Sequence, residues 1–150
     1  MMRIVRIGAF ICVLIAASKA WACSCGHPDP DEFVSGVAIL FEGTMVRTER
    51  VIPDTEHCNG GVGQWCQEVT QGVFVVHKSY KGDLGTEVRV NYGEGAGSSC
   101  GMSFRMDTEV TVAAYGDPET GYTTGFCTQI PLNYEQYRTP ILESAARYRQ

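Results

Sequence analysis

The residues of this chain whose type and spacing are most indicative of chemistry are its cysteines. The sequence holds seven, and six of them follow the first 22 residues. An even number in an exported chain predicts disulfides, here three, and leaves their pairing open. The six are Cys23, Cys25, Cys58, Cys66, Cys100 and Cys127.

The spacing of the cysteines restricts which of them can pair. Cys23 and Cys25 would be strained if they were joined to each other, so each should bind a distant partner. Cys58 and Cys66 lie at the two ends of a Gly-rich loop and would naturally close it. The two most C-terminal cysteines are then left for Cys23 and Cys25.

A zinc site is the alternative interpretation of Cys23-Ser24-Cys25 with His27 nearby, or of His57 beside a cysteine. Structural zinc sites use Cys-x(2–4)-Cys spacing, which Cys-x-Cys does not match. Export also favours oxidised thiols over metal-bound ones. We therefore expect neither a metal ion of the protein's own nor a cofactor.

The first 22 residues have the pattern of a secretory signal peptide. Arg3 and Arg6 precede an apolar run over residues 7–17, and Ala20-Trp21-Ala22 is a small-x-small cleavage site. The run is shorter than the roughly 20 residues that a membrane-spanning helix needs. Cleavage after Ala22 would make Cys23 the first residue and place the protein in a periplasmic or extracellular compartment. An uncleaved anchor is less favoured because the apolar run is short. A lipid-bearing Cys23 is also less favoured, because lipoprotein signals usually carry Leu where Ala20 stands.

Other reactive side chains do not form a catalytic pattern. Residues 97–101 match the Gly-x-Ser-x-Gly nucleophile elbow, but that elbow needs a strand-to-helix turn, and a strand pattern follows here. His27, His57 and His77 are scattered, and Asp29, Asp31 and Glu32 are explained by helix capping. We predict no catalytic residue and no enzyme activity.

Composition sets further limits on function. The net charge is −5, and cleavage would remove three basic residues and no acidic one. An excess of acidic residues disfavours the binding of nucleic acid, because Lys and Arg are needed to neutralise its phosphates. Residues 23–150 have the length of one domain and contain no apolar stretch that could span a membrane.

The pattern of apolar residues and turn signals predicts mainly β structure. Polar, Gly-rich loops are expected at 49–67 and 93–101. Five strands with a helix at each end favour an all-β fold with flanking helices, a small closed barrel, and leave an open sandwich as the alternative. The expected strands are 37–46, 68–80, 87–92, 109–115 and 122–126, and the expected helices are 29–35 and 134–149, with Pro140 as a kink or start.

In this order and spacing, the motifs resemble the netrin-like module, and within it the N-terminal domain of the tissue inhibitors of metalloproteinases, in a compact form similar to its bacterial members. The resemblance covers most of residues 23–150. The matching pieces are Cys23-Ser24-Cys25 with His27-Pro28, Phe41-Glu42-Gly43 within 33–46, Tyr80-Lys81-Gly82-Asp83, Ser99-Cys100-Gly101 with Phe104, residues 110–115, and Gly125-Phe126-Cys127 before Pro131-Leu132.

The resemblance implies a five-stranded OB-fold barrel stapled by disulfides, with Cys23 bonded to Cys100 and Cys25 to Cys127. It also implies an inhibitory edge formed by Cys23, Ser24 and Cys25. In the inhibitors, the amine and carbonyl of the N-terminal Cys chelate the protease's zinc, and the next side chain, here Ser24, enters the specificity pocket.

The sequence departs from the inhibitors at Gly26, in the 49–67 loop and in the local Cys58–Cys66 pair. These departures keep open an alternative function, a secreted binding or structural module that does not inhibit. Its partner could be another protein or a glycan, because OB-folds bind oligosaccharides as well as oligonucleotides.

Overall fold

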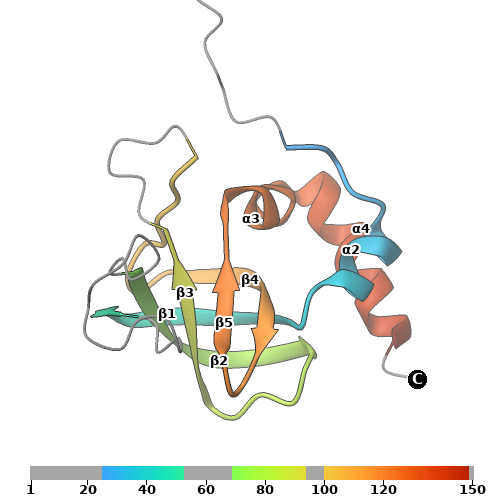
Figure 1. The fold of residues 1–150 in the computed structure, drawn as a ribbon. Coiled ribbons are helices and arrows are strands. Elements are labelled where there is room, and N and C mark those ends of the chain that lie inside the picture. Colours follow the sequence, from blue (N-terminus) through green and yellow to red (C-terminus); the bar gives the residue numbers. More distant parts are fainter. Residues whose placement is uncertain (1–24, 53–68, 94–99, 149–150) are drawn as a thin grey trace, which may run out of the picture.

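The computed structural model describes residues 25–52, 69–93 and 100–148 (Figure 1). Cys23, Ser24, Cys58, Cys66 and the expected signal peptide lie outside the described residues. The elements follow one another in the order α2 (Pro30–Gly36), β1 (Ile39–Val51), β2 (Val69–Lys81), β3 (Glu87–Tyr92), β4 (Glu109–Asp117), β5 (Gly121–Thr124), α3 (Phe126–Asn133) and α4 (Glu135–Tyr148).

The strands close into a barrel in the order β1-β2-β3-β5-β4. β1 completes the ring because it pairs antiparallel with both β2 and β4. β3 and β5 run parallel, over Val90–Tyr92 and Tyr122–Thr124, and every other pair is antiparallel. The predicted five-stranded OB-fold barrel is thus confirmed, and the open-sandwich alternative is wrong.

The barrel interior is filled by side chains that alternate along the strands. Val88, Val90 and Tyr92 of β3 point inward, whereas Glu87 and Arg89, which alternate with them, are exposed. Two-residue alternation of this kind lets one face of a strand bury apolar groups while the other meets water. The other fully or largely buried members of this cluster are Ile39, Phe41, Met45, Phe74, Val112 and Ala114.

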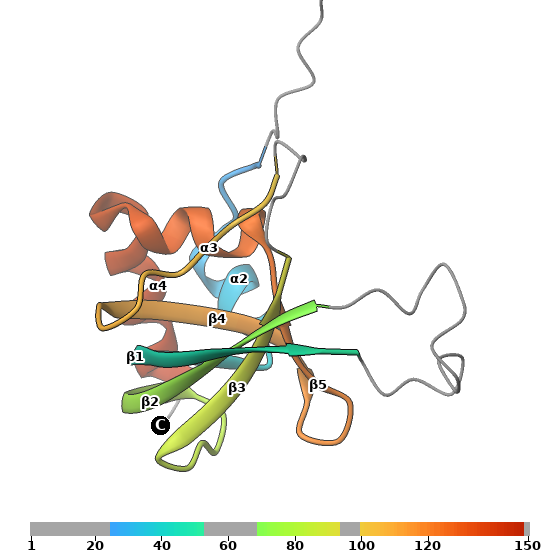
Figure 2. The same ribbon diagram turned by 90° about the vertical axis from the view of Figure 1, so that its left-hand side faces the viewer.

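The helices of the described part gather on one side of the barrel, as Figures 1 and 2 show. A second apolar cluster forms between them and the strands. None of these helices, within the ranges described, is long and apolar enough to cross a membrane. The cluster combines Phe33, Val34 and Val37 with Leu40, Tyr80, Ala113, Leu132, Ile141 and Ala145.

Helix α3 was not predicted. The sequence suggested a strand over 122–126, but β5 ends at Thr124 and the chain turns into α3 at Phe126. The signal was weak because the helix is short, its N-cap Gly125 makes no side-chain cap, and Pro131 lies inside it. Each of these features lowers the helix propensity of the segment.

Other boundaries shift by one or two residues, and the largest difference is at the end of β1. β1 continues past 46 to Val51, because Arg47, Thr48 and Glu49 pair with β2 although their side chains are solvated. α4 begins at Glu135 and contains Pro140, so this proline does not mark the helix start. A polar two-stranded extension and a tolerated proline both escape an analysis based on apolar pattern.

Candidate functional site

The N-terminal end of the described chain is covalently tied to α3. Cys25 and Cys127 form a disulfide with an S–S distance of 2.02 Å and a Cα–Cα distance of 5.2 Å. This is the pair that the resemblance implies. The bond fixes the position of Cys25 beside the first turn of α3.

Cys100 lies at a turn before β4, is exposed and is also disulfide-bonded. The implied Cys23–Cys100 bond, the Cys58–Cys66 bond and the side chain of Ser24 fall outside the described residues. Of the expected inhibitory edge, the structure therefore describes Cys25 and the chain that follows it.

The chain after Cys25 is held against α4 by an aromatic contact. The His27 ring stacks on the Tyr137 ring with a centroid distance of 4.2 Å and an interplanar angle of 15°. The Tyr137 hydroxyl also lies 3.2 Å from His27 Nε2. His27 therefore helps to set the direction of this segment.

Helix α2 continues from this segment and begins with the predicted cap. The Asp29 carboxylate accepts hydrogen bonds from the backbone N–H groups of Asp31 and Glu32, at 2.9 and 3.2 Å. Asp31 in turn accepts from Ser144 and, at 2.7 Å, from Arg147 on α4. The Ser144 bond is the main cause that lowers the pKa of Asp31, and Arg147 lowers it further.

The C-terminal end of α2 is satisfied by a side chain from the barrel. Lys81 Nζ donates to the carbonyl oxygens of Val34, Ser35 and Val37, at 2.7, 3.1 and 2.6 Å. These oxygens are among the acceptors that a helix end leaves unpaired. A cation at this end also interacts favourably with the negative end of the helix dipole. α2 is thereby fixed to β2 as well as to α4.

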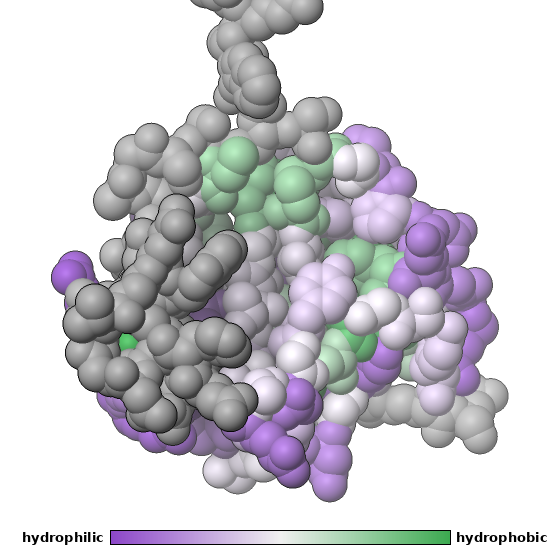
Figure 3. Space-filling view, in the orientation of Figure 1, coloured by the Kyte–Doolittle hydropathy of each residue, from purple (hydrophilic) through white to green (hydrophobic). Residues whose placement is uncertain are grey.

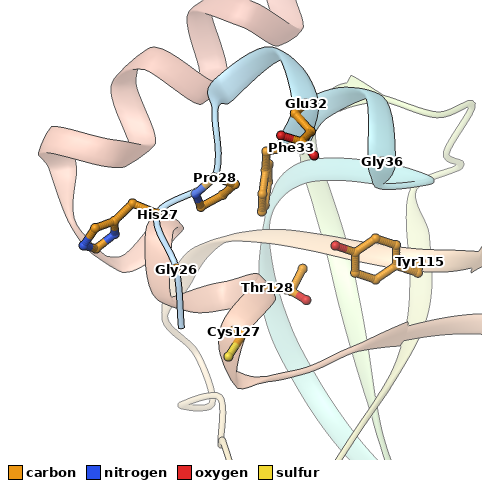
Figure 4. A pocket seen from close by; sticks show the side chains of 9 residues that line it. All are labelled: Gly26, His27, Pro28, Glu32, Phe33, Gly36, Tyr115, Cys127 and Thr128. Atoms are coloured by element: carbon orange, nitrogen blue, oxygen red, sulfur yellow. The ribbon is translucent and has the colours of Figure 1, made fainter. Parts of the chain in front are cut away.

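A hollow of about 470 Å³ opens beside the anchored segment, between α2, α3 and β4. We call it the edge hollow; Figure 4 shows the residues that line it. The Tyr115 hydroxyl points into it, whereas the His27 ring points away. Within the described part of the chain, the Glu32 carboxylate on its rim makes no hydrogen bond or ion pair. The hollow thus combines apolar surface from Pro28 and Phe33 with a free negative charge.

Apolar surface also lies near the disulfide. In Figure 3, apolar side chains gather over the region where β5 leads into α3. The half-buried residues there include Phe126, Met102 and Phe104.

The other reactive side chains that the structure describes are not brought together, and His57 and residues 97–99 of the elbow pattern lie outside the described residues. His77 lies exposed on β2, 2.8 Å from the Thr44 hydroxyl. No helix follows Cys100 directly, since the chain runs on to β4, so the nucleophile elbow lacks its required setting. Among the described residues, no group of three or more His, Cys, Asp or Glu side chains is placed to hold a metal ion.

No protein-family model matches the chain, and no curated protein matches it. Sequence reasoning identified Cys25, Cys127 and the Asp29 cap, but missed Tyr115, Thr128 and Tyr137, which shape the hollow and hold His27. No local motif marks these three residues, because they lie on β4, α3 and α4, and they meet the N-terminal segment only when these elements pack together.

Proposed function

We propose that the protein is an exported, netrin-like inhibitor of zinc metalloproteases. In this proposal, residues 1–22 are a signal peptide whose removal makes Cys23 the amino terminus. The mature protein then acts in a periplasmic or extracellular compartment through the edge formed by Cys23, Ser24 and Cys25.

The observation that carries the proposal is the Cys25–Cys127 disulfide on a closed barrel. Two residues extend at most about 7 Å along the chain, so Cys23 and Ser24 cannot lie far from the anchored Cys25. Stacking of His27 on Tyr137 holds the other side of Cys25. An edge that is rigid before binding loses little conformational entropy when it meets a partner.

The chemistry of a free Cys23 terminus suits a protease zinc ion. An α-amine has a pKa of about 7.7–8.0, so a useful fraction is neutral near pH 7.5 and can donate its lone pair. Together with the Cys23 carbonyl oxygen it could displace the water held at the open coordination position of catalytic zinc. Ser24, with a small polar side chain, would enter the adjoining specificity pocket.

The edge hollow adds a second contact for a protein partner. It lies directly behind Cys25, and its lining includes Cys127 and Thr128 of α3. Glu32 and Tyr115 line different walls of this hollow, and both would favour a basic side chain of the partner, the first through its charge and the second through the face of its ring.

The decisive experiment is to add one Ala ahead of Cys23 in the mature, oxidised protein. Both forms are assayed against a panel of zinc metalloproteases, and a protein with one Ala added after Gln150 serves as the control. We expect the N-terminal extension to abolish inhibition and to leave the melting temperature unchanged, while the control inhibits normally. Equal inhibition by the extended protein would refute chelation by the amine.

Mass spectrometry of the exported protein tests the starting point of the proposal. It reports whether Cys23 is the first residue, whether it carries lipid, and which thiols are joined. A correctly processed, oxidised protein that inhibits no enzyme of the panel would refute the inhibitor function. It would favour the alternative of a non-inhibitory binding module.

A further inference from the structure

A second hollow, of about 450 Å³, opens beside the part of β3 that is not paired with β5. The two strands pair only from Val90 and Tyr122 onward, so Glu87 and Arg89 have no partner in β5. The β4–β5 hairpin at residues 117–121 forms the opposite wall, and the end of β1 closes one side. We call this the mouth hollow, and it shares no lining residue with the edge hollow.

One wall of the mouth hollow carries a pair of amides. Gln71 on β2 lies opposite Asn91 on β3, and its Nε2 donates to Asn91 Oδ1 at 2.8 Å. Within the described residues, Gln71 Oε1 and Asn91 Nδ2 make no other hydrogen bond. The pair therefore leaves one acceptor and one donor without a partner in the described chain, and two sugar hydroxyls can bond to such groups.

The charges of the mouth hollow do not suit a phosphate backbone. Arg89 is its only basic lining residue in the described chain, and the Arg89 guanidinium lies 3.5 Å from the Glu87 carboxylate. Arg47 also approaches Glu87, at 3.4 Å, and Glu119 adds a further negative charge to the lining. A ligand of high negative charge would meet no excess of positive charge here.

Apolar groups complete the lining. Tyr122 is half-buried against the barrel interior, and Ile52 at the end of β1 is 55% exposed. Pro118 stands on the hairpin opposite. Apolar and aromatic surface beside a few placed polar groups is the usual composition of a small-molecule site, and the volume falls in the usual range of about 300–1,000 Å³.

We propose that the mouth hollow binds a neutral oligosaccharide. Its walls come from β2, β3 and the two ends of chain that lead into the β1–β2 and β4–β5 loops, which is the face that OB-fold barrels use for oligosaccharides and oligonucleotides. Because the lining has no excess of positive charge, it favours a neutral oligosaccharide over an oligonucleotide. The amide pair binds the sugar hydroxyls, and Tyr122, Pro118 and Ile52 contact the apolar faces of the rings.

Titration calorimetry on the intact oxidised protein tests this proposal, with maltohexaose, cellohexaose and chitohexaose as neutral probes and a thymidine oligonucleotide as the charged one. We expect one of the sugars to bind, and Asn91→Ala and Gln71→Ala each to weaken it up to about tenfold, the loss expected for a hydrogen bond. Glu143→Ala, on an exposed position of α4 outside the mouth hollow, is the control and should leave binding unchanged.

Three results would overturn the proposal: no binding of any of the three sugars up to about 10 mM, binding that both amide variants retain in full, or tighter binding of the oligonucleotide. Circular dichroism of each variant separates a lost contact from a lost fold. Because no protease takes part in these measurements, their outcome is independent of whether the edge inhibits.

Discussion

Removal of the Cys25–Cys127 disulfide should destabilise the protein strongly without leaving a cavity. The bond closes a loop with a sequence separation of 102 residues. In the chain-entropy model, such a loop in a chain without other crosslinks corresponds to about 4.7 kcal/mol of stability at 25 °C. This is an upper value here, because Cys100 is also disulfide-bonded and a remaining bond shortens the loop that Cys25 and Cys127 close. Cys127 is exposed and Cys25 half-buried, so the double variant Cys25→Ala, Cys127→Ala gives up little packing, and the effect should come mainly from the unfolded chain.

Urea unfolding of the oxidised double variant, followed by circular dichroism, measures this loss. We expect a fall of about 2–5 kcal/mol in the free energy of unfolding, the range usual for native disulfides. The slope of that free energy against urea should rise, because a chain without this crosslink exposes more surface when it unfolds. Replacing both cysteines leaves no odd thiol, which keeps other pairings unchanged.

The reasoning would be wrong if the double variant lost less than about 1 kcal/mol. Such a result would mean that the stacking of His27 on Tyr137 and the bonds around α2 hold the N-terminal segment without the crosslink. If the proposed inhibitor function holds, the same variant should also inhibit poorly, because Cys25 is no longer anchored to Cys127.

Two further predictions concern pH and backbone geometry. The pKa of Asp31 is lowered mainly by its hydrogen bond from Ser144. The Asp31 carboxylate therefore stabilises the fold fully at pH values above its pKa in the unfolded chain, near 3.8, and this stabilisation is lost as the pH falls through the lower pKa of the folded state. The stability difference between wild type and Asp31→Asn, measured by urea unfolding, should therefore shrink between about pH 6 and about pH 2.5; a constant difference contradicts it. Gly116→Ala should cost more than about 2 kcal/mol, because φ is +103° and the new Cβ would lie 2.3 Å from the Gly121 carbonyl oxygen. Gly85→Ala, which meets nothing within 4 Å, is the control, and equal melting temperatures of the two variants would refute the argument.

The barrel could be predicted because its strands carry strong local signals. The alternation over Glu87–Tyr92 and the apolar start of β1 reflect a face that must be buried, and burial is recorded in residue type. Asp29 before Pro30 likewise marks the start of α2, because both residues act within a single helical turn.

The candidate sites could be predicted only in part, because they depend on contacts between distant segments. The residues alone left the pairing of Cys25 open, and only the resemblance pointed to Cys127. Tyr137 meets His27 across a separation of 110 residues. The mouth hollow exists because β3 and β5 pair over part of their length, and no pattern within either strand records where that pairing begins.

The three bonds from Lys81 to the end of α2 also bear on the order in which the molecule assembles. A helix of seven residues is too short to persist alone in water, and α2 has no basic residue in its own last turn. Its missing partner arrives on β2, more than 40 residues later in the chain. The end of α2 is therefore completed only after β1 and β2 have paired, so a chain that stops before Lys81 lacks the group that fixes this helix to the barrel.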